Sequence, residues 1–344
     1  YILSIFFEID CSIMIAKLGK SDHTSSIHPR LFAAPLQGYT TAPFRHFHAA
    51  FYGHEKDSPG EVTYIAPFLR IEHGAPRAKE LNDIASPLNA NHRLVPQIIF
   101  GNEDEFERLT DAVASHGFSD VNLNLGCPYP MQRSRGRGAA FVSDPTKIEM
   151  LARWTERHSD MRFSIKMRPG VESCDEWRAS AAILADMKPE WIAMHPRRAA
   201  DLYRGNASFE VFREFAETVG VERVVYNGDI DSPEKAELLL DSFPCGIAGI
   251  MIGRWMLADP AAFTQLCGNA MPDPEMLFRL HDAILTHYRT IMTGGDHQLL
   301  SRIREFWGYA EPTLGRKAWK KIVKAGTLRN YEAAVAEARR QYCR

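Results

Sequence analysis

Residues 121–130 read VNLNLGCPYP, an apolar run into which two asparagines and a cysteine are set. Alternate residues of a β-strand point to opposite faces, so Asn122 and Asn124 share one face while the valine and the leucines share the other. We expect the apolar face to pack against helices and the asparagines to point into the mouth of a barrel. The stretch therefore predicts a strand whose two faces meet different surroundings.

The strand ends at Gly126 and Pro128, which turn the chain so that Cys127 overhangs a pocket at the carboxyl end of the strand. A cysteine in such a place is more often an inert buried residue than a catalyst. This stretch alone therefore favours an inert, buried Cys127.

Strands of the same kind alternate with amphipathic helical stretches from residue 31 onward. Strand-like runs lie at 31–38, 61–69, 94–101, 120–128, 162–170, 190–197, 223–230 and 246–254. Helical stretches, with apolar residues every three to four positions, lie at 104–117, 147–159, 176–187, 209–220 and 233–243. This alternation predicts an α/β fold with parallel strands. Eight units favour a (β/α)₈ TIM barrel over a doubly wound sheet, whose glycine-rich turn is missing after the first run.

The connections between strands are marked with uneven clarity. Residues 70–93 contain a glycine and two prolines and show little helical period, so we predict an irregular crossover there. Elsewhere Asp144, Ser232 and Asp259 are each a helix-capping residue followed by a proline suited to the first helical turn.

The pattern divides the chain into three parts. Residues 1–28 form an N-terminal extension of unknown role, which faintly resembles a signal sequence but has acidic residues in its apolar run. Residues 29–271 form the barrel. Residues 272–344 show no strand signal and four helical stretches, so we predict a small all-helical domain there; the stretches lie at 275–292, 300–311, 316–325 and 330–342.

Composition excludes several classes of protein. No apolar run approaches the roughly 20 residues that cross a bilayer. The six cysteines include no C-x-x-C pair, which argues against a zinc site or a secreted disulfide framework. We therefore expect a cytoplasmic monomer with reduced thiols, no metal and no membrane partner.

Charge is distributed unevenly along the chain. The net charge is -2, yet residues 301–344 hold eleven Lys and Arg against four Glu. A basic tail on an acidic body suggests a polyanionic partner at that end. The alternative, a solvated helical face, is the commoner role of such charge runs.

Polar side chains collect where the strand-like runs end, which is where TIM barrels gather their reacting groups. Each of these side chains could simply form hydrogen bonds to the backbone of a loop or pair with a carboxylate. Because they follow seven of the eight runs, a polar pocket is favoured. They are Gln37, Gln97, Asn122, Asn124, Cys127, Lys166, Arg168, His195, Arg197, Asn227, Asp229 and Arg254.

The last two strand-like runs end in NGDI, residues 227–230, and in GIMIGRW, residues 249–255. Barrels frequently bind a phosphate at these ends through loop amides and a helix N-terminus. Arg254 could supply a bidentate partner. The alternative for Gly253 and Arg254 is a tight turn with an exposed arginine; the barrel position favours the phosphate.

From about residue 31 onward the chain resembles the tRNA-dihydrouridine synthase family, whose members reduce a uridine base in tRNA with FMN. The resemblance rests on several segments in the family's order and spacing: AAPLQGYT at 33–40, VNLNLGCPYPMQRSRGRGAAFVSDP at 121–145, KMRPG at 166–170, MHPR at 194–197, YNGDI at 226–230 and MIGRW at 251–255. Departures are Leu36, Gln37 and the HPRR segment, where the family commonly has Met, then Glu or Val, and H-G-R-T.

The resemblance implies sites for FMN and tRNA. Its residues would hold FMN through Pro35, Leu36, Gln37, Gln97, Lys166 and His195, and its phosphate through Asn227, Gly228, Asp229, Gly253 and Arg254. Substrate contacts would come from Asn124, Arg168 and Arg197, and tRNA phosphates would rest on Arg316, Lys317, Lys320 and Lys321.

The resemblance also implies a reaction. Hydride passes from reduced flavin to C6 of uracil, Cys127 gives a proton to C5, and NADPH reduces the flavin again. A thiol with a pKa near ~8.5 is mostly protonated at neutral pH and can act as this acid. The buried target base must first be extruded from the tRNA.

Three rival functions are open to the same residues. Another flavin barrel, such as a dihydroorotate dehydrogenase, would share the phosphate end and Lys166 but would not explain the basic helical domain. A phosphate-binding lyase or synthase predicts a colourless protein. A tRNA-binding protein without catalysis leaves Cys127 and Lys166 without a role.

Overall fold

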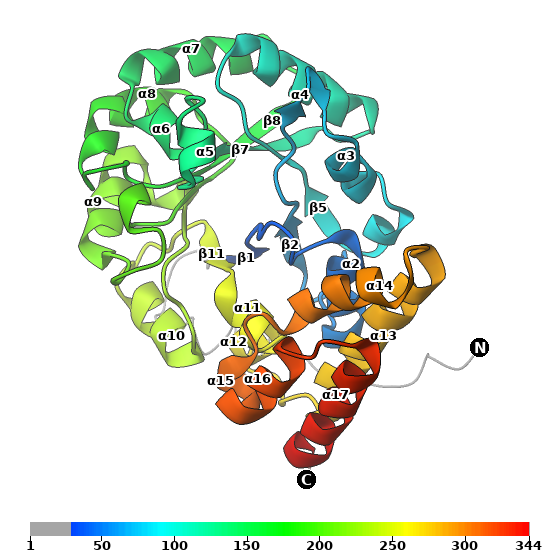
Figure 1. The fold of residues 1–344 in the computed structure, drawn as a ribbon. Helices are drawn as coiled ribbons and strands as arrows, with labels where there is room; N and C mark the ends of the chain where they lie inside the picture. Colours follow the sequence, from blue (N-terminus) through cyan, green and yellow to red (C-terminus); the bar gives the residue numbers. More distant parts are fainter. Residues whose placement is uncertain (1–28, 344) are drawn as a thin grey trace.

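The computed structural model describes residues 29–343, and its centre is a closed barrel of parallel strands (Figure 1). Neighbouring strands follow the order β5-β2-β1-β11-β10-β9-β8-β7-β6. Their bounds are β1 Arg30–Ala33, β2 Val62–Ile65, β5 Arg93–Val95, β6 Gln97–Ile98, β7 Asp120–Leu125, β8 Arg162–Met167, β9 Ile192–Met194, β10 Val224–Tyr226 and β11 Gly249–Ile252.

The third predicted strand, 94–101, is divided in the structure. Pro96 has no N–H group to add to the ladder, so it separates β5, which pairs with β2, from β6, which pairs with β7. Its carbonyl still accepts the N–H of Asn122 at 2.8 Å. Because β5 and β6 belong to one run, the two ends of the sheet meet and the eight predicted strands close into a barrel. The predicted fold class is confirmed.

The predicted irregular crossover at 70–93 is more regular than we expected. A short hairpin joins β3 Ile71–Glu72 to β4 Ala75–Pro76, and it turns at two residues with positive φ, His73 and Gly74. The helix α3 Ala78–Ile84 and a 3₁₀ turn at Pro87–Asn91 follow. The short length of these elements hid their periods in the sequence.

Helices form a ring around the strands (Figure 1). Two predicted caps are confirmed, because Asp144 accepts the N–H of Thr146 and Ser232 accepts that of Lys235. The third predicted cap is wrong. Asp259 accepts the N–H of Ala261, but the helix α12 starts only at Ala262, so Asp259 lies too early in the chain to be its N-cap. The short helix α5 Pro130–Arg133 lies inside this ring, next to the end of β7. The other helices of the barrel are α2 Ala42–Tyr52, α4 Glu103–Ser115, α6 Ala139–Val142, α7 Pro145–Glu156, α8 Ala181–Asp186, α9 Phe209–Val219, α10 Pro233–Asp241, α11 Arg254–Ala258 and α12 Ala262–Leu266.

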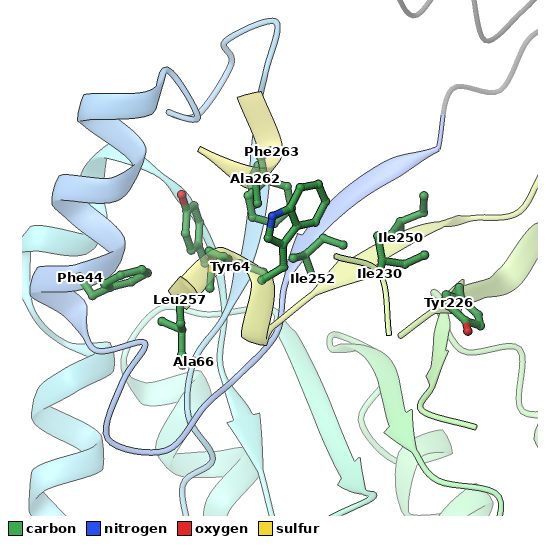
Figure 2. Close-up of a cluster of buried hydrophobic side chains, with 14 of the residues drawn as sticks. Phe44, Tyr64, Ala66, Tyr226, Ile230, Ile250, Ile252, Leu257, Ala262 and Phe263 are labelled. Atoms are coloured by element: carbon green, nitrogen blue, oxygen red, sulfur yellow. The ribbon is translucent and has the colours of Figure 1, made fainter. Parts of the chain in front are cut away.

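The core has one layer inside the barrel and one between the barrel and its helices. As predicted, the apolar face of β7 belongs to the outer layer, where Val121, Leu123 and Leu125 are fully buried. Figure 2 shows part of this layer, with Phe44 of α2 and Phe263 of α12 near Tyr64 of β2. Burial of each such side chain contributes about 1.5–3 kcal/mol to folding.

The chain after the barrel is entirely helical in the part that the structure describes. These helices gather on one side, against α2 and α11 (Figure 1). The predicted boundary between residues 271 and 272 falls in the link before α13, and the division into domains stays a prediction. The bounds are α13 Glu275–Ile291, α14 Gly295–Ile303, α15 Glu311–Leu314, α16 Arg316–Val323 and α17 Leu328–Tyr342.

Candidate active site

A pocket opens at the carboxyl ends of the barrel strands, as the polar strand ends predict. It encloses about 740 Å³ of empty space, part of it open to solvent, which lies within the range of small-molecule and cofactor sites. Nine of the residues predicted for the site line it: Pro35, Leu36, Gln37, Gln97, Asn124, Cys127, Lys166, Arg168 and His195.

The two asparagines of β7 belong to a chain of amide hydrogen bonds that ends at the cysteine. Asn122 donates to Ser164 at 2.9 Å and accepts from Gln97 at 2.7 Å. Gln97 in turn accepts from Asn124 at 2.8 Å, and the Asn124 oxygen accepts the backbone N–H of Cys127 at 2.9 Å. Asn122 therefore lies inside the barrel below the pocket, and Asn124 fixes the loop that carries Cys127.

Cys127 lies at the pocket wall with only 6% of its surface exposed. Burial raises the pKa of its thiol, and the nearby cations Arg168 and Lys166 oppose this effect in part. The segment that follows packs closely, since a Cβ on Gly138 would lie 2.8 Å from the Cys127 Cβ. The structure thus holds a protonated thiol in a fixed place.

Lys166 reaches the pocket from β8. Shielding of the ammonium group from bulk water, together with the nearby cation Arg168, lowers its pKa to about 7. Among the described residues no carboxylate forms a salt bridge with it. A half-buried ammonium group without a carboxylate partner is costly, so this position suits a ligand that carries or develops negative charge.

His195 is neutral in this setting. Burial, with the cations Arg168, Lys166 and Arg197 next in effect, lowers its pKa well below the ordinary value. Its Nε2 lies 3.2 Å from Nη1 of Arg197, so this nitrogen accepts a hydrogen bond. Arg197 itself does not line the pocket; it donates to Asp229 and to the carbonyl of Gly205, both at 2.7 Å.

The five residues predicted to hold a phosphate do not line this pocket, but Arg254 lies beside it, 5.1 Å from the ring of Tyr203. Asp229 binds both Arg197 and Arg254, so it orients these arginines. Asn227 donates to the carbonyl of Met251 at 2.8 Å and thereby joins β10 to β11.

The backbone at these strand ends has unused donors. Among the described residues, the N–H groups of Gly228, Asp229 and Gly253 have no hydrogen-bond acceptor. A side chain at Gly228 would collide with the hydroxyl of Tyr226 at 2.0 Å from its Cβ. Free amides on a glycine backbone beside Arg254 form a suitable cradle for a phosphate.

Four tyrosines line the pocket that the sequence did not predict: Tyr39, Tyr129, Tyr203 and Tyr309. The Tyr203 ring lies near the guanidinium groups of Arg168 and Arg254, at 5.6 and 5.1 Å from the ring centroid. Tyr39 and Tyr309 meet edge to face at 5.1 Å. All four come from loops, where no periodic pattern marks an aromatic residue, and Tyr309 comes from the helical part.

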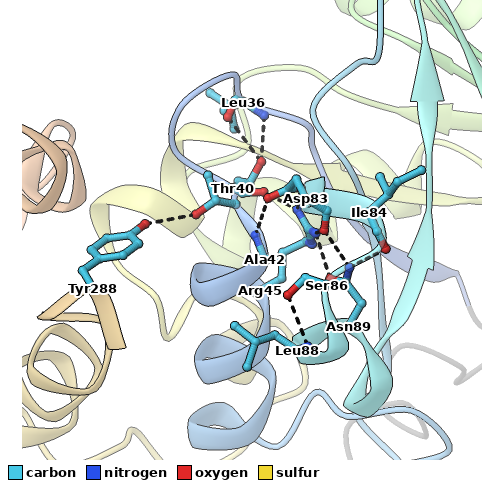
Figure 3. A network of polar contacts seen from close by, with 11 residues as sticks. Leu36, Thr40, Ala42, Arg45, Asp83, Ile84, Ser86, Leu88, Asn89 and Tyr288 are labelled. Atoms are coloured by element: carbon cyan, nitrogen blue, oxygen red, sulfur yellow. Dashed lines mark hydrogen bonds and ion pairs between the residues drawn. The ribbon is translucent and has the colours of Figure 1, made fainter. Parts of the chain in front are cut away.

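A buried arginine holds the loop between β1 and α2, which carries Pro35, Leu36 and Gln37. Arg45 is fully buried and donates to the carbonyl of Thr40 at 2.7 Å and to Asp83 at 2.9 Å (Figure 3). Asp83 also accepts the N–H of Ala42 at 2.8 Å. Tyr288 of α13 contacts the Thr41 hydroxyl, so the helical part helps to position the same loop.

The four basic residues predicted to bind tRNA are exposed on α16 and do not line the pocket. Lys321 pairs with Glu337 of α17. In the described part of the chain no salt bridge involves Arg316, Lys317 or Lys320. These three therefore offer the more available charges.

Two negative findings concern the residues from 29 to 343. No helix there has the length and apolarity that a membrane span requires. No group of three or more His, Cys, Asp or Glu side chains there is placed to hold a metal ion.

Comparison with known proteins identifies the family. A family model described as dihydrouridine synthase matches residues 32–342. A "Probable tRNA-dihydrouridine synthase" of Treponema pallidum is 24% identical over 330 residues, which cover 91% of this chain and 94% of that protein. The "tRNA-dihydrouridine synthase B" of Vibrio cholerae is 26% identical over 294 residues, which cover 83% of this chain and 84% of that protein. Because the family model spans nearly all of the described barrel and helices, this chain belongs to the dihydrouridine synthase family.

Proposed function

We propose that this protein reduces the C5=C6 bond of a uridine in tRNA to give dihydrouridine, with FMN as cofactor and NADPH as reductant. The observation that carries the proposal is a buried thiol at Cys127 in one pocket with the half-buried amino group of Lys166, which has no carboxylate partner among residues 29–343. The family model and relatives named as tRNA-dihydrouridine synthases support the same activity.

The residues present fit FMN. The free backbone amides of Gly228, Asp229 and Gly253, with Arg254, suit its phosphate. Lys166 suits the edge of the isoalloxazine ring on which negative charge develops, because a fixed cation in a shielded pocket stabilises that charge. When bound, FMN would supply hydride chemistry at C6 of the uracil.

The chain itself would supply the proton. Cys127 donates the proton of its thiol to C5 and is left as a thiolate, which Arg168 and Lys166 stabilise because both cations favour the charged form. Asn124 keeps the loop of Cys127 in place through two backbone N–H groups, those of Gly126 and Cys127. His195, neutral and held by Arg197, offers no competing charge.

tRNA is the proposed substrate because a second surface matches it. Exposed, unpaired cations on α16 can contact phosphates outside the pocket. Another flavin barrel acting on a small molecule would have no use for this surface.

Replacement of the thiol tests the proposal. We expect Cys127→Ala to retain flavin absorbance and tRNA binding, while dihydrouridine formation falls by about 10²–10⁴-fold, the usual contribution of a general acid. Cys174→Ala is the matched control, since that thiol does not line the pocket. Normal turnover by Cys127→Ala would show that another group donates the proton. A wild-type protein without flavin and without effect on cellular dihydrouridine would overturn the function itself.

A further inference from the structure

The loop that follows Cys127 exposes two large apolar side chains at the rim of the pocket. Tyr129 is 55% exposed and lines the pocket, and Met131, on α5, is 70% exposed. In Figure 1 α5 lies next to the end of β7, inside the ring of outer helices. No element of the described chain covers these side chains, although exposing them to water is unfavourable.

The loop is rigid. Prolines precede and follow Tyr129, and Pro130 occupies the first turn of α5, so the backbone has little freedom to lose on binding. At the far end of the loop the buried Arg137 pairs with Glu105 and donates to the carbonyl of Ile71 at 3.3 Å. The exposed tip is therefore a formed projection anchored at both ends.

Positive charge flanks the apolar tip. Arg135 is exposed and forms no salt bridge among the described residues, and Arg133 has its nearest carboxylate, on Glu172, at 3.7 Å. Proteins that enter a base stack combine an apolar wedge with cations that contact the neighbouring phosphates. The tip has both parts, which favours a nucleic acid over an apolar protein surface as its occupant.

We propose that Tyr129 and Met131 enter the tRNA base stack beside the target uridine and fill the gap that its extrusion leaves. The inference rests on the proposed function. It adds the side chains that offset the free-energy cost of extruding the base. An extruded base leaves its neighbours unstacked, and an apolar side chain restores part of that contact. The positions suit this role, because Tyr129 and Met131 follow Cys127 by two and four residues, and the extruded base must reach Cys127.

Met131 offers the sharper test, because it does not line the pocket. After the modified uridine has been mapped, we compare two RNAs: the complete tRNA transcript and a 12-nucleotide single strand of the same sequence. Met131→Ala is expected to slow reduction of the folded tRNA about 10-fold and to leave the single strand unaffected, since that strand has no stack to repair. Leu238→Ala, 69% exposed on α10, is the matched control and should change neither rate.

A second measurement follows base extrusion without chemistry. A 2-aminopurine beside the target uridine should brighten when wild type binds the transcript, and brighten less with Met131→Ala. Tyr129→Phe should behave as wild type and Tyr129→Ala should not, because stacking requires the ring and not the hydroxyl. Equal rates and equal fluorescence for Met131→Ala and wild type would overturn the proposal that these side chains enter the base stack. If wild type itself reduces neither RNA, the proposed function fails, and the inference fails with it.

Discussion

At the scale of single residues, Asn124 shows how a strand end becomes part of a reacting site. The family resemblance implies a substrate contact for Asn124, and that contact stays a prediction. The structure shows its oxygen bound to the N–H groups of Gly126 and Cys127 and its amide N–H bound to Gln97. Asn124 is thus a positioning residue for the thiol, in addition to any contact that its remaining N–H makes.

This arrangement predicts a specific defect. Asn124→Ala leaves both N–H groups without an acceptor, so the thiol loses its fixed place, and we expect the turnover number to fall about 10²-fold. Flavin absorbance and the Michaelis constant for tRNA should stay near those of wild type. Faster alkylation of Cys127 by iodoacetamide would report the loosened loop. A rise in the Michaelis constant with unchanged turnover would instead indicate that Asn124 binds the substrate.

In the proposed reaction the pKa of Cys127 sets the pH range of activity. The thiol must be protonated to act as an acid, and burial raises its pKa above the ordinary value of 9.0. With flavin bound and already reduced, we expect the midpoint of the decline in single-turnover rates to lie above pH 9.0. A decline that starts near neutral pH and persists in Lys166→Arg, whose side chain does not titrate in this range, would contradict the assignment of the acid.

At the scale of elements, the pair Arg45–Asp83 joins α2 to α3 beneath the pocket loop. Asp83→Ala would leave a fully buried guanidinium without its carboxylate, which costs about 3–5 kcal/mol of folding stability. Urea unfolding followed by circular dichroism measures this loss. Glu210→Ala, which removes an exposed partner of Arg213, is the control and should leave the midpoint unchanged.

The helix α16 is expected to carry much of the salt dependence of tRNA binding. Lys317→Glu and Lys320→Glu should each weaken binding and reduce the slope of log affinity against log salt by about 1. Lys321→Gln should have a smaller effect, because its ammonium already pairs with Glu337. Fluorescence anisotropy at several salt concentrations separates these outcomes, and equal slopes for all variants would place the tRNA elsewhere.

Elements differed in how well the sequence predicted them. The barrel strands are short runs of apolar and β-branched residues with polar groups at their ends, so each could be read from its own residues. The hairpin at 71–76 could not, because two residues per strand show no period. Pro96 divides the third predicted strand. The sequence contains this signal, but the apolar residues around Pro96 made the run read as one strand.

At the scale of the whole molecule, the pocket joins parts that the sequence keeps apart. Side chains at strand ends could be placed together because parallel strands of a barrel share one mouth. The tyrosines could not, since Tyr309 reaches the pocket only because the helical part packs beside α2 and α11. Nothing in the local sequence around Tyr309 indicates that packing.

Three buried histidines make the whole fold sensitive to acid. His48 of α2, His54 and His92 are nearly inaccessible; the rings of His48 and His92 contact Tyr64, and that of His54 contacts His48. Burial lowers their pKa values to about 3, about 4 and about 3. In the unfolded chain each titrates near its ordinary value of 6.5. Below pH 6.5 the unfolded chain therefore binds more protons than the folded one, so the free energy of unfolding is full above that pH and declines as the pH falls.

Each histidine should contribute about 1.4 kcal/mol per pH unit to this decline until its own folded pKa is reached. His92 provides the test, because its Nε2 has no hydrogen-bond partner among the described residues and its one polar contact is that of Nδ1 with Asn91, at 3.0 Å. We expect His92→Phe to flatten the plot of unfolding free energy against pH, between pH 6 and 4.5, by about one proton. The control His116→Gln replaces an exposed ring and should leave the slope unchanged. Equal slopes for His92→Phe and wild type would mean that His92 is already protonated in the folded protein, and the buried cluster would then require a counterion that its neighbours do not provide.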